Sequence, residues 1–295
     1  MKFSPFMSSG SAPQRPDSQL RASPDGGEKR RWNPQLIFSL TAVQSSFGLV
    51  LVLFLFLPVL SLFLSVTPSR FVSALGQEVV RDALGLSFRT SVIALFLVVL
   101  FGTPLAHRLA TGRKFFGQAI VEALLQLPWI TPPAVAGLAL LMAFGREGLV
   151  GRMLADWGIA LPFTTAAVVV AQAFEGSAFY VQSARQAFTG VDRQLAEVSR
   201  TLGAGPWRTW LRLELPMALP GLVAGAAMAW ARALGEFGAT MLFAGNMQGL
   251  TQTMPLAIYT VMEKDMDAAV AMAIVLVIVG FGLLWMLFRL GQRMA

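Results

Sequence analysis

Three charged side chains stand inside apolar stretches of the sequence, and they are the first candidates for chemistry. Arg232 and Glu236 lie four residues apart in the stretch 217–244, and Glu175 lies in the stretch 161–181. The four-residue spacing places Arg232 and Glu236 on one face of a helix. A charge at membrane depth costs roughly 2.5–3.5 kcal/mol and usually faces a bundle interior or an aqueous path. The group can therefore be a buried ion pair that fixes helix packing, or a contact for an anion in transit.

Glu175 bears on that choice, because a second carboxylate near mid-membrane would oppose the passage of an anion unless it is paired or protonated. The sequence offers two partners for it, Arg232 and Arg185. We therefore treat Arg232, Glu236 and Glu175 together as candidates for a translocation path.

The segment 197–216 is a polar, basic insert between two apolar stretches. It reads EVSRTLGAGPWRTWLRLELP, in which the notable positions are Glu197, Val198, Ser199, Gly203, Leu213, Leu215 and Pro216. Just before and within it, Leu195, Val198 and Leu202 recur at helical spacing. Gly203 permits a sharp reversal, and Pro206 suits the first position of a second helix. The segment is thus two short helices around a turn, or a generic amphipathic loop at the membrane surface.

The spacing resembles the E-A-A-x3-G-x9-I-x-L-P motif of the cytoplasmic loop by which permease subunits of bacterial ABC importers bind their ATPase. Val198 and Ser199 stand at the two alanines, and Leu213 stands at the isoleucine. The resemblance implies an all-helical integral membrane protein of the type-1 importer permease fold. It also implies that the first short helix docks on a cytoplasmic ATPase dimer, while Glu197, Gly203, Leu215 and Pro216 hold the shape of the loop.

A second resemblance concerns the substrate. The runs ARALGEFGAT (231–240), TQTMPLAIYT (251–260) and LPWITPPAVAGLALLMAFGREGLVG (127–151) are similar to the permease subunit of molybdate importers, from about residue 87 to the C-terminus. This implies transport of a tetrahedral oxyanion, with molybdate expected and tungstate, sulfate or thiosulfate as alternatives within the same fold. It also implies an external substrate-binding protein, a homodimer of the permease and a place in the bacterial inner membrane.

Composition supports a membrane protein. The chain is 55% hydrophobic and 13% charged, whereas soluble domains are about 25% charged. The net charge of +7 fits cytoplasmic loops that are rich in Lys and Arg, so we expect contact with membrane lipid and no binding of nucleic acid.

Six apolar stretches are long enough, or nearly so, to cross a membrane. They lie at about 36–64, 91–106, 120–144, 161–181, 217–244 and 268–288, and Pro128, Pro132 and Pro133 interrupt the third. Placing both termini in the cytoplasm puts sixteen Lys and Arg residues inside and five or six outside, with Arg89 at a border, which satisfies the positive-inside rule. The same orientation places 197–216 in the cytoplasm, where an ATPase would bind.

The domain organisation follows from these stretches. Residues 1–34 form a basic cytoplasmic tail with too few apolar side chains to fold alone. Residues 35–86 add a transmembrane helix and an external loop to the part that resembles the family. Residues 87–290 form the permease domain, with the coupling loop at 190–216.

Catalysis has little support in the sequence. A phosphate-binding G-x-x-x-x-G-K-[ST] loop is absent, so ATP and Mg²⁺ are expected on the partner ATPase, with no cofactor, metal or catalytic residue in this chain. The single histidine, His107, is expected to be a solvated residue at the membrane surface. The rival of a different class is a proton-coupled secondary carrier that uses Glu175, Arg232 and Glu236. An intramembrane enzyme would need a nucleophile and base, or a metal cluster, that the chain does not offer.

Overall fold

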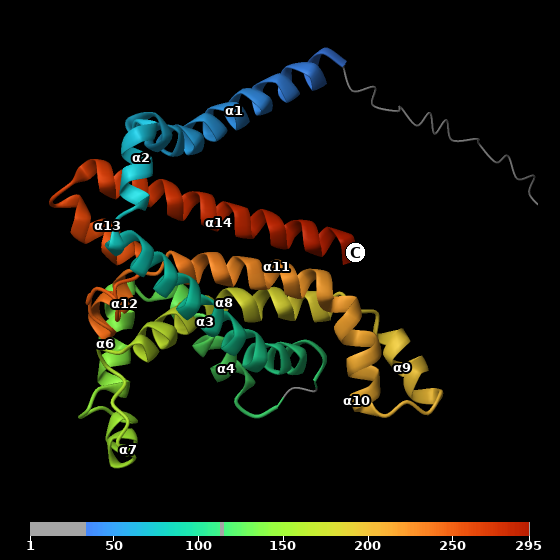
Figure 1. The fold of residues 1–295 in the computed structure, drawn as a ribbon. Helices are drawn as coiled ribbons and strands as arrows, with labels where there is room; N and C mark the ends of the chain where they lie inside the picture. Colours follow the sequence, from blue (N-terminus) through green and yellow to red (C-terminus); the bar gives the residue numbers. More distant parts are fainter. Residues whose placement is uncertain (1–33, 113–114, 295) are drawn as a thin grey trace, which may run out of the picture. The chain divides into compact units, whose positions relative to one another are not determined.

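The structure is a computed structural model that describes residues 34–112 and 115–294. The predicted basic tail lies outside this part of the chain, except for Pro34. The described residues form helices, turns and loops, with no strand among them (Figure 1). The chain divides into two compact units, Met1–Leu55 and Phe56–Ala295.

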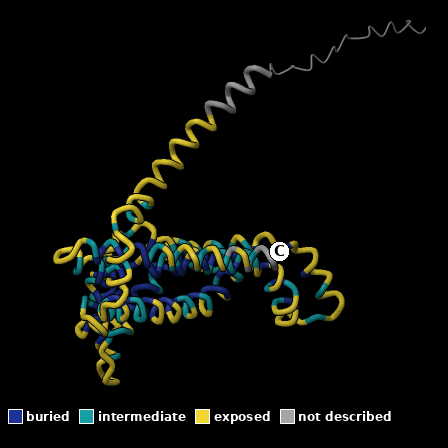
Figure 2. The backbone as a smooth tube through the Cα atoms, turned by 45° about the horizontal axis from the view of Figure 1, so that its top comes forward, coloured by how far each residue is buried: buried dark blue, intermediate teal, exposed yellow. Residues whose placement is uncertain are grey.

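The described part of the first unit, residues 34–55, lies wholly in α1 (Pro34–Ser65), whose last residues belong to the second unit; α1 agrees with the apolar stretch predicted at 36–64. Its segment Gln44–Ser65 is strongly apolar and none of its most apolar window is buried (Figure 2). A helix that exposes apolar side chains on every side suits a lipid environment.

The second unit contains the remaining helical segments. They are α2 (Pro68–Leu75), α3 (Glu78–Thr111), α4 (Gln118–Leu124), α5 (Leu127–Ile130), α6 (Pro133–Phe144), α7 (Gly151–Asp156), α8 (Thr165–Thr189), α9 (Arg193–Thr201), α10 (Pro206–Thr209), the π-helical turn η1 (Trp210–Glu214), α11 (Leu215–Leu234), α12 (Gly238–Phe243), α13 (Met254–Met262) and α14 (Met266–Met294). The core forms where α8 packs against α3 on one side and α11 on another, and α14 packs against α11 (Figure 1).

Small residues allow α8 and α11 to approach closely. A Cβ atom on Gly221 would lie 2.5 Å from the Cβ of Ala187, and one on Gly225 would lie 2.7 Å from the Cβ of Ser183. The run of small side chains in α11 is therefore a packing face, as is common where membrane helices meet.

Two of the predicted apolar stretches are interrupted. The stretch 120–144 forms α4, α5 and α6, because its prolines cannot continue a helix. The expectation of one helix over 217–244 is wrong in its middle, since α11 ends at Leu234 and α12 begins at Gly238. A Cβ atom on Gly238 would lie 2.6 Å from the Cβ of Pro133, so this break lets α12 pass close to the start of α6.

By length and hydropathy, four helical segments of the described residues can cross a membrane. They are Gln44–Ser65, Glu78–Thr111, Pro206–Leu234 and Met266–Leu287. The two remaining predicted crossings correspond to the broken segment α4–α6 and to α8, a helix of 25 residues that carries buried Gln172 and Glu175.

Candidate translocation site and coupling loop

The three charged residues singled out in the sequence meet in the structure. Arg232, in the last turn of α11, places Nη2 2.5 Å from Glu175 Oε2 on α8, and Nη1 3.5 Å from Glu236 Oε2. The Glu175 and Glu236 side chains are 0% and 1% exposed, whereas the Arg232 side chain is 30% exposed. Of the two partners considered for Glu175, Arg232 is the correct one, because Arg185 pairs with Glu122 instead.

The two carboxylates differ in their other contacts. Glu236 Oε1 accepts hydrogen bonds from the backbone N–H groups of Ala239, at 2.6 Å, and Thr240, at 3.4 Å. Glu236 therefore accepts hydrogen bonds from N–H groups at the start of α12 and also pairs with Arg232. Glu175 Oε1 is buried without a hydrogen-bond partner among the described residues, so the guanidinium is the main compensation for the Glu175 charge.

A cavity adjoins the Arg232 side chain. Arg232 lines a volume of about 410 Å³ together with Pro128, Trp129, Ile130, Thr131, Pro132, Pro133 and Phe179. This is the point where the chain between α5 and α6 leaves helical geometry. Broken helices at membrane depth occur where they are covered by protein or line an aqueous path. The cavity thus combines a cationic donor with irregular backbone, which is a suitable environment for an anion in transit. We call it the Arg232 cavity.

The segment that precedes α11 has the helix–turn–helix form that its spacing predicted. Asp192 caps α9, since its Oδ1 accepts a hydrogen bond from the backbone N–H of Gln194 at 2.9 Å. Gly203 follows α9 with φ +84°, a conformation that favours glycine, and Pro206 is the first residue of α10. The chain then runs through η1 into α11, so Leu213 lies in η1 and both Leu215 and Pro216 begin α11.

One face of α9 is apolar and exposed. Leu195, Val198 and Leu202 are 42%, 54% and 83% exposed, and Glu197 is exposed beside them. The opposite side is held within the loop, where Ala196 is buried and the Ser199 and Thr209 hydroxyls lie 3.1 Å apart. The loop is therefore braced internally and presents an apolar ridge outward.

A contact that the sequence did not indicate joins this loop to α3. His107 Nε2 lies 2.5 Å from Glu214 Oε2 in η1, and the His107 ring meets the rings of Phe188 and Trp210 edge-on, at 5.1 and 5.9 Å. The expectation that His107 is a solvated surface residue holds only in part, because the side chain is 26% exposed while its ring packs between α8 and η1. Positions 107 residues apart in sequence share no periodic pattern, so only folding reveals this pair.

No group of three or more His, Cys, Asp or Glu side chains within residues 34–112 and 115–294 is arranged to hold a metal ion.

Residues 99–295 match the family model described as "Binding-protein-dependent transport system inner membrane component". The chain belongs to this family. Membership makes it a transport subunit of the inner membrane rather than an enzyme, and confirms the resemblance to ABC importer permeases.

Curated relatives extend over much of the chain. A probable transport system permease protein, NifC of Clostridium pasteurianum, is 38% identical over 93% of this chain and 95% of its own length. The molybdenum transport system permease protein ModB of Mycobacterium tuberculosis is 42% identical over 77% of this chain and 86% of its own length. The ModB protein of Escherichia coli K12 is 40% identical over 62% of this chain and 80% of its own length.

Solved structures share the fold. A chain of the bacterial alginate ABC transporter, crystallised with an alginate-bound periplasmic protein, superposes with a TM-score of 0.71 at 16% identity, over 88% of this chain and 96% of that chain. A chain of the MetNI methionine ABC transporter in an inward-facing conformation superposes with a TM-score of 0.55 at 18% identity, over 73% of this chain and 94% of that chain. The ABC importer permease fold is therefore confirmed, at identities that say nothing of substrate.

Proposed function

We propose that this chain is the permease subunit of an ATP-driven importer for molybdate. The support is the family, the identity of about two-fifths to the two proteins named as molybdenum permeases, and the Arg232 cavity. Tungstate and sulfate are dianions of the same tetrahedral shape, so they are the competing substrates that an experiment must separate.

The membrane topology is part of the proposal. Six crossings are formed by α1, α3, the broken segment α4–α6, α8, the α11–α12 segment and α14, and both termini lie in the cytoplasm. Residues 1–34 are then the tail, residues 35–86 the additional helix with its external loop, and residues 87–290 the permease domain. The excess of Lys and Arg on the cytoplasmic side supports this orientation.

The observation that carries the proposal is the exposed apolar ridge of α9. Leu195, Val198 and Leu202 are exposed on a short helix that its own loop holds in place. A cleft on the ATPase would bury these side chains, and each buried apolar side chain is worth about 1.5–3 kcal/mol. Glu197 and Gly203 then shape the loop, and nucleotide and Mg²⁺ reside on the ATPase.

Two copies of the permease frame one path on a two-fold axis, with an ATPase dimer on the cytoplasmic side and a substrate-binding protein outside. Closure of the ATPases on ATP draws the two coupling loops (residues 190–216) together and opens the path outward. Hydrolysis restores the inward-facing state. The nucleotide can drive this cycle only because it stabilises the two states to different extents.

The test uses the permease reconstituted in liposomes with its ATPase and with binding proteins loaded with molybdate, tungstate or sulfate. We expect molybdate-loaded protein to stimulate ATP hydrolysis and uptake, and Glu197→Lys to abolish both while Leu138→Ala, at an exposed position of α6 outside the loop, leaves them intact. Stimulation by sulfate alone would overturn the substrate. Uptake that needs a proton gradient and no ATPase would instead support the secondary carrier.

A further inference from the structure

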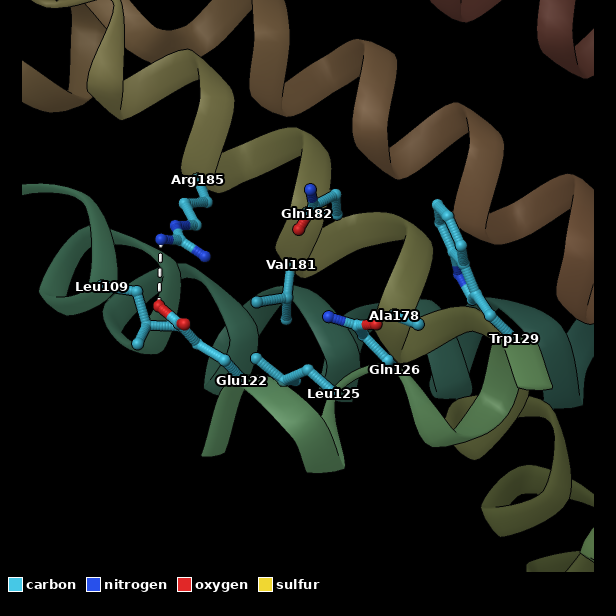
Figure 3. Close-up of a pocket in the computed structure, with 9 residues that line it drawn as sticks. All are labelled: Leu109, Glu122, Leu125, Gln126, Trp129, Ala178, Val181, Gln182 and Arg185. Atoms are coloured by element: carbon cyan, nitrogen blue, oxygen red, sulfur yellow. Dashed lines mark ion pairs between the residues drawn. The ribbon is translucent and has the colours of Figure 1, made fainter. Parts of the chain in front are cut away.

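A second cavity opens on the same helix as the charged cluster. Its volume is about 270 Å³, and it is lined by Leu109, Glu122, Leu125, Gln126, Trp129, Ala178, Val181, Gln182 and Arg185 (Figure 3). The side chains come from α3, from α4, from α5 and the two residues before it, and from α8. We call it the Arg185 cavity.

The cavity contains three side chains with N–H donors suited to an oxyanion, Gln126, Gln182 and Arg185, beside the carboxylate of Glu122. Arg185 Nη2 lies 3.0 Å from Glu122 Oε1, and the two side chains are 35% and 32% exposed, so the pair is accessible. Gln126 and Gln182 add amide N–H donors to the guanidinium. The Glu122 carboxylate pairs with the guanidinium as an oxyanion would, and it also accepts a hydrogen bond from Gln118 Nε2 at 3.0 Å. A carboxylate that moves aside therefore keeps a partner.

An aromatic contact connects the two cavities. Trp129 lines both of them, and Phe179 lines the Arg232 cavity. The two rings pack together with centroids 5.2 Å apart. Along α8, Phe179 lies between Glu175 and Arg185, which are separated by about 15 Å at the rise of a regular helix. The ring pair therefore adjoins both cavities.

We propose that the Arg185 cavity is a second oxyanion site on the path that passes Arg232, and that Trp129 and Phe179 form the gate between the two. The inference rests on the proposed function. Each arginine is paired with a glutamate, so an oxyanion must compete for it and cannot bind too tightly. Conduction through several sites requires binding that is favourable enough to enter and weak enough to leave.

The chain contains no cysteine, which makes a labelling test direct. The assembled importer, with ATPase and binding protein, is prepared with the single substitution Gln182→Cys and treated from the ATPase side with an anionic thiol reagent. We expect molybdate to slow labelling several-fold. Adding Arg185→Gln to this variant is expected to remove the protection. The control is Thr189→Cys, an exposed site about two turns beyond Gln182 on α8, which is expected to label without protection.

The outcomes separate this proposal from the proposed function, because uptake by the unsubstituted importer is measured in parallel. The second site alone is overturned by either of two results. In one, the importer takes up molybdate but molybdate does not protect the Gln182→Cys variant from labelling. In the other, protection from labelling survives the addition of Arg185→Gln. Uptake of sulfate instead of molybdate overturns the substrate, and protection is then measured with sulfate. Two results verify that the Arg185→Gln variant is folded. Labelling of Thr189→Cys in this background is unchanged, and the ATPase subunit stays bound to the permease.

The gate has its own readout. Trp129→Ala removes the ring that separates the cavities, so preloaded liposomes are expected to lose molybdate without ATP, faster than with the unsubstituted importer. Leu138→Ala, an exposed side chain on α6, is the matched control. Equal retention by the two variants would exclude Trp129 as a gate.

Discussion

Removing the charge of Arg232 tests whether the buried cluster is a structural ion pair, a contact for the anion, or both. Arg232→Met leaves Glu175 and Glu236, which are 0% and 1% exposed, without their counter-charge. Removing one partner of a buried pair costs about 3–5 kcal/mol. Part of this loss is offset for Glu236 by the backbone N–H groups of Ala239 and Thr240. Most of the destabilisation should therefore arise at Glu175.

The opposite substitution should be mild. Glu175→Gln leaves an amide oxygen to accept from Arg232, and the guanidinium keeps Glu236 as its counter-ion. Exchanging a charge-assisted hydrogen bond for a neutral one costs about 1 kcal/mol. The double variant Arg232→Met with Glu175→Gln removes the carboxylate that suffers most, so it should recover much of the stability lost in Arg232→Met.

The assay measures the free energy of unfolding in detergent and ATP-driven uptake in liposomes for the three variants. If Arg232 contacts the anion, the double variant folds but does not transport. Transport by the double variant at the unsubstituted rate would refute that role and leave a purely structural pair. An Arg232→Met variant as stable as the unsubstituted chain would refute the reasoning about the buried charges.

Three further predictions concern the coupling loop and the helix packing. Gly203→Ala forces a side chain into φ +84°, a left-handed conformation that costs about 1–2 kcal/mol, so the ATPase should co-purify poorly with this variant. The control Gly205→Ala, at φ −66°, should retain the ATPase. His107→Ala removes the contact between α3 and η1, so more ATP should be hydrolysed per anion imported, while the ATPase stays bound. Gly225→Ala overpacks α11 against α8 and should lower the free energy of unfolding by about 1–3 kcal/mol, whereas Gly85→Ala, whose Cβ would meet no atom within 4 Å, should not.

Each of these has a contradicting outcome. Equal loss of the ATPase in the Gly203 and Gly205 variants would mean that backbone conformation is not the cause. An unchanged ratio of hydrolysis to transport in His107→Ala would exclude the contact with η1 from coupling. Equal stability of the Gly225 and Gly85 variants would mean that α8 yields to the added methyl group.

Several features could be predicted from the sequence because they depend on neighbours along the chain. The length of the apolar stretches and the low share of charged residues indicated a helical membrane protein. The spacing from Glu197 to Pro216 predicted the helix, the turn at Gly203 and the second helix from Pro206, all of which the structure contains. Helical periodicity, a positive φ at glycine and a fixed φ at proline are local properties, so a short run of residues specifies them.

Other features were decided only by tertiary packing. From the sequence alone, Glu175 had two candidate partners, the contact of His107 with Glu214 was not foreseen, and 217–244 was expected to be one helix. Arg232 and Glu175 are 57 positions apart, and His107 and Glu214 are 107 positions apart. Which side chains meet over such separations depends on how α3, α8 and α11 pack, and on the break that brings Gly238 against Pro133. That packing depends on how the surfaces of whole helices fit together, as Gly221 fits against Ala187. The spacing of residues along one segment does not predict such a fit.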